Sequence, residues 1–291
     1  MPLACLTDFQ AFARERLPKS TWDFIEGGAD DSFTRDDNIA AFKRKLFVAE
    51  HRIRLRPRYL KNVVNVDTRT TIQGEEITAP ICISPTGFHC LVWPDGEMST
   101  ARAAQAAGVC YITSTFATCA LEDIAATAPR GLRWFQLYVH PDRQLSKQLV
   151  QRVESLGFKA LVITVDVPKL GNRRHDIRNQ LDLKLNLLLK DLRWPKEIDA
   201  LAEVVAAVKG AMEVYLDGGI RTGNDVLKAL ALGAKCVFLG RPILWGLAYK
   251  GEDGVKELLN IIKNEFHTSM ALTGCQSVAD INQDMVQFSR L

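Results

Sequence analysis

Apolar runs that each precede a helical pattern recur along most of the chain. The runs that predict strands end in turn residues and are PICIS (80–84), VCYITST (109–115), RWFQLYV (133–139), ALVITVD (160–166), EVYLDGG (213–219) and CVFLGRP (236–242). Strands that are apolar on both faces and alternate with helices are typical of a parallel sheet covered by helices. The pattern therefore predicts an α/β protein.

The spacing of these strands indicates which α/β architecture they form. Successive strand centres lie 23–30 residues apart, which suits one strand–helix unit, except for a step of 52 residues between positions near 162 and 214. A closed (β/α)8 barrel needs eight strands, and only six are visible. We predict a single TIM (β/α)8 barrel domain over residues 1–291 that lacks about two βα units, strands 5 and 6, through an internal deletion near residues 193–197.

The N-terminal part of the chain precedes the first barrel strand. Residues 8–43 carry apolar positions at three- and four-residue spacing, broken at GGADD (27–31). They predict an N-terminal helical cap over about residues 1–60. The basic cluster RIRLRPRYLK (52–61) reads as a solvated strand or loop.

Composition and charge narrow the choice of partners. With 47% apolar and 24% charged residues the chain is typical of a soluble globular protein, and a net charge of +3 gives no reason to expect a nucleic-acid or membrane partner. Seven cysteines without C-x-x-C spacing and five histidines without metal-ligand spacing predict reduced thiols and no metal site. The terminal Ser289, Arg290 and Leu291 match the peroxisomal address that an import receptor binds, or else form an arbitrary tail.

Two glycine-rich turns carry the strongest local signal. YLDGGIRTG (215–223) and FLGRP (238–242) each place glycine and arginine between a strand and a helix. Glycine lets the backbone approach an anion, the helix N-terminus offers free N–H groups, and arginine adds a fork of donors. Such turns on the last two strands form the usual phosphate site of a barrel, so we predict phosphate binding. The alternative is that these glycines only form tight turns.

Other polar residues stand at the carboxyl ends of strands, where barrel enzymes place their chemistry. They are Ser84, Thr86, Ser114, Thr115, Gln136, Tyr138, Thr164 and Asp166. Because they recur strand after strand, we predict a row of hydrogen-bonding groups around a planar cofactor, although each would also suit a satisfied polar group of the core or a loop. Arg173 and Arg174 follow the fourth strand, and an arginine pointing into the mouth would suit a carboxylate substrate.

These segments together resemble one family. PICISPTGFHCLVWPDGE (80–97), TSTFAT (113–118), FQLYV (135–139), TVDVPKLGNRRHDI (164–177) and YLDGGIRTGNDVLKALALGAKCVFLGRP (215–242), with MALTGCQS and the terminal SRL, are similar to the FMN-dependent (S)-2-hydroxy acid oxidases, most of all to their peroxisomal long-chain branch. The resemblance implies a TIM barrel of the FMN-dependent oxidoreductase type in a homotetramer. It also implies FMN as cofactor and the oxidation of medium- or long-chain 2-hydroxy acids to 2-oxo acids, with O2 reduced to H2O2.

The resemblance assigns roles to individual residues. Pro85, Thr86 and Gly87 would contact the flavin, with glycine where the family usually has alanine. The isoalloxazine ring would be contacted by Ser114, Gln136 and Thr164. The ribityl chain and phosphate would be held by Asp217, Gly218, Gly219, Ile220, Arg221, Gly240 and Arg241. Tyr138 and Arg173 would bind the substrate carboxylate. Phe24, where short-chain relatives have tyrosine, would make the mouth more apolar.

The chain departs from the family pattern at two places. Segment KLFVAEH (45–51) looks like an insertion, expected as a surface loop or a gene-model error. Near residues 193–197 two βα units of the family are missing. One carries a lysine that stabilises reduced flavin. The other carries a Ser-Asn-His-Gly-Gly-Arg motif whose histidine is the catalytic base and whose arginine grips the substrate carboxylate.

The second departure means that no catalytic residue can be assigned within this chain. Two alternatives to an active oxidase therefore stay open. The first is an inactive product of exon skipping or of a faulty gene model that retains partial FMN binding. The second is a phosphate-binding barrel enzyme without a redox role.

Overall fold

The computed structural model describes residues 2–43, 45–46, 51–165, 171–180 and 197–289, and the structural statements below refer to these residues. Several sequence predictions fall outside them. Asp166, residues 193–196 of the predicted junction, and the terminal Arg290 and Leu291 are not described. No helix within the described ranges combines the length and the apolar character needed to cross a bilayer.

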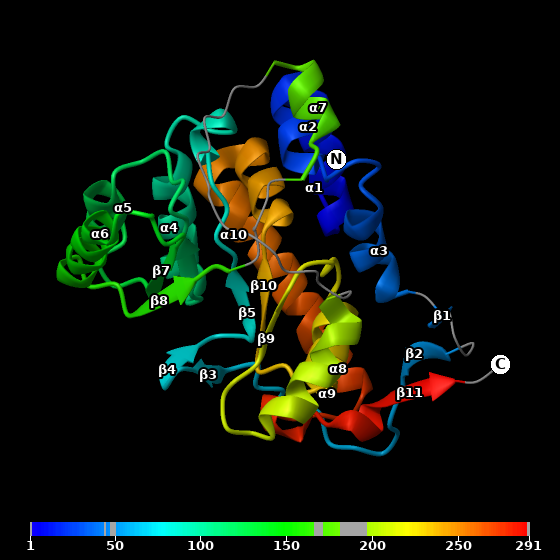
Figure 1. Cartoon of the computed structure of the whole chain (residues 1–291). Coiled ribbons are helices and arrows are strands. Elements are labelled where there is room, and N and C mark those ends of the chain that lie inside the picture. The colour runs from blue at the N-terminus through cyan, green and yellow to red at the C-terminus, as the bar shows by residue number, and fades with distance from the viewer. Residues whose placement is uncertain (1, 44, 47–50, 166–170, 181–196, 290–291) are drawn as a thin grey trace.

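A six-stranded parallel sheet forms the centre of the molecule (Figure 1). Its strands are β5 (Ile81–Ile83), β6 (Tyr111–Thr113), β7 (Arg133–Leu137), β8 (Ala160–Ile163), β9 (Tyr215–Asp217) and β10 (Cys236–Leu239). The spatial order is β8-β7-β6-β5-β10-β9, and every neighbouring pair is parallel. All six predicted strands are confirmed. The first strand pairs with the last, as the strands of a closing barrel do, with Ile81 opposite Val237.

In the described residues the sheet is a half-barrel of six parallel strands, which confirms the α/β class and leaves the fate of strands 5 and 6 of the predicted TIM barrel open. Within the described residues, β8 and β9 are its two edges and do not pair with each other. Strand β8 leaves apolar side chains in solvent, since Leu161, Ile163 and Val165 are 38%, 54% and 56% exposed. By contrast, every residue of β5, β6, β7 and β10 is buried. The six strands are thus confirmed, whereas the loss of two βα units stays a prediction.

Helices follow the strands in the predicted alternation. They are α4 (Gly96–Ala107), α5 (Leu121–Thr127), α6 (Arg143–Ser155), α7 (Arg174–Arg178), α8 (Glu197–Val208), α9 (Gly223–Ala231) and α10 (Arg241–Leu272). Local sequence fixes their ends. Asp142 caps α6 by accepting a hydrogen bond from the N–H of Gln144, and Thr222 and Asp225 form a capping box at the start of α9. Gly108 ends α4 in the left-handed conformation.

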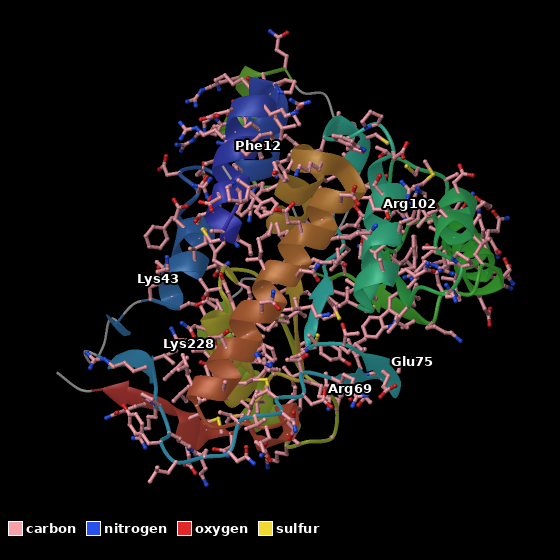
Figure 2. All side chains as sticks on the ribbon, turned by 180° about the vertical axis from the view of Figure 1, so that it is seen from behind. Phe12, Lys43, Arg69, Glu75, Arg102 and Lys228 are labelled. Atoms are coloured by element: carbon pink, nitrogen blue, oxygen red, sulfur yellow. The ribbon has the colours of Figure 1, made fainter. Side chains whose placement is uncertain are left out.

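Helix α10 is the element on which the others pack. It bends at Lys250 and Gly251, whose backbone angles are not helical. The ring of Tyr249 meets Phe9 and Phe12 of helix α1 (Leu6–Arg16) edge-on, with ring centroids 5.4 and 4.9 Å apart. Figure 2 shows Phe12 on α1 beside α10. On the α4 side, Arg102 forms an ion pair with Glu252 of α10, and Arg102 is labelled there in Figure 2.

The N-terminal cap is only partly helical, which corrects the prediction for residues 1–60. Helices α1, α2 (Lys19–Glu26) and α3 (Phe33–Ala41) end at residue 41. Strands β1 (Lys45–Leu46) and β2 (His51–Leu55) follow, and β2 pairs antiparallel with β11 (Val286–Ser289) at the other end of the chain. Part of segment 45–51 is therefore strand and not surface loop. Residues 45, 46 and 51 belong to the pairing of β1 with β2, and the C-terminal VQFS of β11 extends this sheet by pairing with residues 52–55, a distant contact that a local pattern cannot reveal.

Small elements complete the chain. Strands β3 (Thr70–Ile72) and β4 (Glu75–Ile77) form a hairpin whose turn residues Gln73 and Gly74 both have positive φ, as the favoured two-residue hairpin turn requires. Short 3-10 helices lie at His89–Leu91 (η1), Val278–Asp280 (η2) and Gln283–Met285 (η3).

Replacing Leu258 tests the central role of α10. Its side chain is fully buried, so Leu258→Ala should lower the free energy of unfolding by about 2–5 kcal/mol through lost burial and a residual cavity. Leu272 lies on the same helix but is 63% exposed, and Leu272→Ala should change stability by less than about 0.5 kcal/mol. Urea denaturation of both variants measures the difference; equal losses would contradict this assignment of the core.

Candidate functional site

The carboxyl ends of the six parallel strands share one edge of the sheet, and the predicted site residues follow one another along it. The strand order places Thr164, Gln136, Ser114, Thr86, Gly240 and Asp217 in succession from β8 to β9. Segments that are distant in sequence thus become neighbours. The hydroxyl of Ser84, after β5, donates to Asp217 Oδ1, at the end of β9, over 2.7 Å. The edge is therefore one continuous polar surface.

A cavity of about 330 Å³ opens at the β5, β9 and β10 end of this edge. Its floor is made by the glycine-rich turns, and helices α2 and α3 of the cap close it from the other side. All the cofactor residues predicted from these three strands line it: Pro85, Thr86, Gly87, Asp217, Gly218, Gly219, Ile220, Arg221, Gly240 and Arg241. Phe24, predicted to contact substrate, also lines it.

Glycine is required at the floor of the cavity for a physical reason. Gly218 and Gly219 have φ of 105° and 76°, a region that other residues adopt only with strain. A Cβ on Gly219 would stand 2.4 Å from the carbonyl oxygen of Asn38 in α3. Next to it, Gly240 immediately precedes the N-terminus of α10, where Pro242 has no N–H and the Ile243 N–H donates to the Gly240 carbonyl oxygen at 2.9 Å. The turns thus present bare backbone and a helix N-terminus to the cavity, as an anion site requires.

Three arginines and one carboxylate line the cavity: Arg35, Arg221, Arg241 and Asp217. Burial lowers the pKa of Arg221 to about 10, with Glu26 and Asp225 acting in the opposite direction, so the guanidinium stays charged at neutral pH. It lies over the ring of Trp245, 5.0 Å from the centroid. Arg241 donates from Nε to the carbonyl oxygen of Ile25, at 2.9 Å. The cavity therefore holds fixed positive charge.

Asp217 combines two properties. Its side chain is open to the cavity, yet the carboxyl lies deep among protein atoms, and this depth raises its pKa above the ordinary value. The hydrogen bonds from Ser84 and the N–H of Gly218, and the charge of Arg241, act against that rise. Because the group is accessible from the cavity, we infer that it remains a hydrogen-bond acceptor there.

The next part of the edge is a chain of side-chain hydrogen bonds. Gln136 Nε2 donates to Thr164 Oγ1 at 2.8 Å, and its Oε1 accepts from the hydroxyl of Ser114 at 3.4 Å and from the N–H of Thr115 at 3.1 Å. The predicted ring contacts Ser114, Gln136 and Thr164 are thus brought together on three adjacent strands. They are not among the residues that line the cavity; they continue the edge beyond it.

An aromatic row, Phe24–Phe88–Phe116–Tyr138, connects the predicted substrate residues. Successive ring centroids are 5.7, 6.1 and 5.5 Å apart. Arg173 lies over the Phe24 ring, 5.0 Å from its centroid, and donates to the Phe24 carbonyl oxygen at 2.6 Å. It also forms an ion pair with Asp176. Phe88 and Phe116 were not predicted, because nothing local to GFHC or STFA signals that their rings stack.

A buried histidine and glutamate support the loops behind this row. His89 Nε2 and the Thr86 hydroxyl are 2.7 Å apart, and its Nδ1 lies 3.0 Å from the Thr100 hydroxyl. Glu97 accepts hydrogen bonds from the N–H groups of His89 (3.1 Å), Thr118 (2.9 Å) and Cys119 (3.1 Å) and from the Thr118 hydroxyl (2.7 Å). Sequence reasoning missed this role, since Glu97 reads only as a first-turn acid of α4.

The chain belongs to the FMN-dependent dehydrogenase family, whose model matches residues 13–194 and 193–288. Among curated relatives, 2-hydroxyacid oxidase 2 of Homo sapiens is 64% identical over 361 aligned positions that span 100% of both chains. A peroxisomal (S)-2-hydroxyacid oxidase of Arabidopsis thaliana is 38% identical and covers 96% of this chain and 95% of its own length.

Solved structures show the same likeness. Mandelate oxidase with (S)-2-phenylpropionate superposes with a TM-score of 0.89 at 33% identity, covering 99% of both chains. A flavocytochrome b2 mutant with pyruvate bound gives a TM-score of 0.89 at 30% identity, covering 98% of this chain and 86% of the other. The half-barrel is therefore built on the framework of these flavoproteins.

The residues present fit FMN. The group has an anionic phosphate, and the cavity offers glycine backbone at Gly218, Gly219 and Gly240 together with three arginines. A planar ring needs hydrogen-bonding groups along a flat edge, and Ser114, Gln136 and Thr164 supply them. Donor chemistry and shape thus agree with the cofactor of the family.

Gly219 can be tested against a glycine of the same backbone conformation. Gly219→Ala should lower the free energy of unfolding by more than the roughly 1–2 kcal/mol that a left-handed conformation costs, because the new Cβ meets Asn38. Gly210 has a φ of 78° with nothing within 4 Å of its Cβ position, so Gly210→Ala carries the conformational cost alone. Urea denaturation compares them, and an equal loss in the two variants would refute the close approach.

Glu97 should make the protein sensitive to acid. Burial acts to raise its pKa, but the hydrogen bonds from Thr118 and the charge of His89 lower it below 4.5, and the net shift is downward. Burial also lowers the pKa of His89, so its ring is uncharged at neutral pH. At neutral pH the Glu97 carboxylate is therefore stabilised by its hydrogen bonds and not by a charge on His89.

Glu97→Gln replaces an acceptor oxygen by an amide and should cost about 1–3 kcal/mol of stability at neutral pH. A carboxylate with a depressed pKa stabilises the fold above its unfolded pKa and loses that effect as the pH falls through the folded pKa. The stability difference between wild type and variant should therefore shrink as the pH drops below 4.5. Denaturation curves across that range check this, and a constant difference would contradict it.

Proposed function

We propose that this chain binds FMN along the carboxyl edge of its sheet and oxidises 2-hydroxy acids to 2-oxo acids. The observation that carries the proposal is the order of the edge. Along the edge, the anion cavity at β9, β10 and β5 is followed by the hydrogen-bonding row on β6, β7 and β8, as a phosphate would be followed by a flavin ring. The aromatic row runs beside both, from Phe24 in the cavity wall to Tyr138. The relatives of Homo sapiens and Bos taurus that are 64% and 63% identical to this chain are named 2-hydroxyacid oxidase 2, which supports this activity.

The residues that would hold FMN divide into two groups. Gly218, Gly219, Arg221, Gly240 and Arg241 would take the phosphate, with Asp217 and Ile220 beside the ribityl chain. The flavin ring would contact Pro85, Thr86, Gly87, Ser114, Gln136 and Thr164. Bound FMN supplies the redox chemistry, accepting two electrons from the hydroxy acid and passing them to O2, which becomes H2O2.

Substrate would lie over the aromatic row. Arg173 and Tyr138 would bind its carboxylate, the arginine through a planar fork that matches two oxygens. Phe24, Phe88 and Phe116 offer apolar ring surface next to that charge, and Phe24 brings no hydroxyl to the mouth. This favours 2-hydroxy acids with medium or long apolar chains over short ones.

We further propose that about two βα units of the family are missing near residues 193–197, and that the described residues therefore hold no catalytic base. Three observations support this. The sheet is open between β8 and β9 in the described residues. The family model matches as two segments that meet at residues 193–194. The alignment with the human relative has 361 positions against 291 residues in this chain, so about 70 positions of the relative have no counterpart.

This opening favours a second candidate function, a chain that holds FMN but turns over little substrate. General acid–base help is worth roughly 10²–10⁴-fold in rate, and its loss would leave binding intact. The residues proposed to hold FMN all lie outside residues 193–197, so the chain could bind the cofactor without turning over substrate.

Location and assembly complete the proposal. The terminal Ser289, Arg290 and Leu291 would direct the chain to peroxisomes through the import receptor, and one relative carries the word peroxisomal in its name. A homotetramer follows from the resemblance to the family.

Purification and one anaerobic titration test the function. A yellow protein whose flavin absorption bleaches when 2-hydroxyoctanoate is added without air supports oxidation. A yellow protein that does not bleach supports the second candidate. A colourless, folded protein would refute FMN binding and favour a phosphate-binding barrel without a redox role.

Two glycine variants control the experiment. Gly219→Ala should purify with less flavin, because its Cβ meets the Asn38 carbonyl oxygen and the glycine turn at the cavity must shift, whereas Gly210→Ala should retain the wild-type amount. Flavin released on heating and measured by fluorescence gives the ratio of flavin to chain.

A further inference from the structure

Two cysteines stand beside each other at the mouth of the half-barrel. Cys90 lies on η1, after β5, and Cys119 lies in the loop between β6 and α5. Their sulfur atoms are 3.7 Å apart. Cys90 is exposed and Cys119 is partly exposed. The sequence places them 29 residues apart and gives no sign of the contact.

We propose that hydrogen peroxide oxidises Cys90 and Cys119 to a disulfide, so that this thiol pair is an oxidative modification site on the loops after β5 and β6, one of which also carries cavity residues. The proposed oxidase function would supply the peroxide, and in that respect the inference rests on it. A disulfide requires a sulfur–sulfur distance near 2.05 Å. Two side chains already in contact on surface loops can reach it by rotation about their Cα–Cβ bonds.

The chemistry balances in two steps. The Cys90 thiolate attacks one peroxide oxygen, the O–O bond breaks, and Cys90 becomes a sulfenic acid while hydroxide leaves and takes up a proton to form water. The Cys119 sulfur then attacks the Cys90 sulfur, the S–O bond breaks and a second water leaves. Two thiols lose two electrons and two protons in total, and one peroxide gains them.

The surroundings of the two thiols decide which cysteine is oxidised first. Burial and the neighbouring Glu97 carboxylate raise the pKa of Cys119 to about 12, so this thiol keeps its proton at neutral pH. Cys90 is the more exposed of the two and is the sulfur that peroxide reaches first. Cys119 then resolves the sulfenic acid because it is already in contact.

The chain contains its own comparison for the role of access. Cys82 and Cys236 are 3.5 Å apart, closer than the pair at the mouth, but both side chains are fully buried. Peroxide cannot reach them without unfolding, since oxidation of cysteine depends on exposure as well as on thiolate character. Proximity alone would favour Cys82 and Cys236, whereas proximity with access selects Cys90 and Cys119.

A metal site made of Cys90, Glu97 and Cys119 is the competing interpretation, since their ligand atoms lie within 4.8 Å of one another. The hydrogen bonds of Glu97 argue against it. Its two oxygens already accept from three backbone N–H groups and one hydroxyl. A cation would have to displace bonds that hold both loops, whereas a disulfide leaves all of them in place.

The disulfide would act on the cavity through its neighbours. Cys90 follows His89, whose ring contacts the Thr86 hydroxyl on the cavity wall. Cys90 N–H donates to the Thr118 hydroxyl at 3.1 Å, next to Cys119. A covalent bond at this point would join the loop that carries Pro85 to Gly87 with the loop that carries Phe116, and so fix the mouth in one arrangement.

The purified full chain, with its flavin, is treated with a small excess of H2O2 at neutral pH, unfolded in an alkylating agent and digested with trypsin. We expect the free thiols to fall from seven to five and peptides 70–102 and 103–130 to become joined. Each of these peptides holds two cysteines, so fragmentation must place the link between Cys90 and Cys119. A thiol reductant should restore all seven.

Two variants sharpen the result. Cys90→Ser should show no joined peptides after the same treatment. Cys5→Ser, which removes a cysteine outside the pair, should still lose two thiols, from six to four. Seven thiols after treatment, a link that survives in Cys90→Ser, a sulfinic acid on Cys90 without a link, or bound zinc whose removal by a chelator frees the two thiols would each overturn the proposal.

A separate arm tests the source of peroxide. A 2-hydroxy acid and air replace the added H2O2, with and without catalase. A link that forms here and is lost with catalase supports the oxidase as the source. A link with added peroxide but none in this arm leaves the site standing and counts against the proposed turnover instead.

Discussion

Parallel strand pairing is the constraint on which the candidate site depends. Because all six strands run the same way, their carboxyl ends meet on one edge, and residues from distant parts of the chain become neighbours there. The pairing of β5 with β10 matters most, since it joins the first strand to the last. Ser84 follows β5 and Asp217 ends β9, and the two side chains can share a hydrogen bond because β5 and β9 both lie next to β10.

Arg241, which lines the cavity, also holds the cap, and Arg173 adds a second cap contact outside the cavity. Arg241 donates to the carbonyl oxygens of Ile25 and Gly27, and Arg173 donates to that of Phe24. Helix α10 adds a bond from Trp245 Nε1 to Glu26, at 2.8 Å. On the far side, Lys228 of α9 donates to the carbonyl of Phe42 at 2.8 Å, and Figure 2 shows Lys228 and Lys43 on that face. Docking of the cap and the shape of the anion site are thus coupled.

Local chemistry explains what could be predicted from the sequence. The six strands are apolar runs bounded by turns, and Gly219, Arg221, Gly240 and Arg241 belong to turns whose meaning is fixed within a few residues. The features that the sequence did not predict depend on contacts between distant parts of the chain. Strand β2 exists because β11 pairs with it, and the stacking of Phe88 on Phe116 requires two loops from different strands to meet. The role of Glu97 was hidden for the same reason, as its donors come from the loop after β6.

The open edge at β8 has a consequence for the life of this chain in a cell. Among the described residues, the exposed Leu161 and Ile163 stand on an edge that no further strand pairs with, the combination that invites strand addition by another chain. In a cell, chaperones and proteases continuously act on molecules that open or unfold. How long a molecule survives would then be set by how fast a partner covers this strand, and abundance, more than catalytic constants, would decide what the protein contributes.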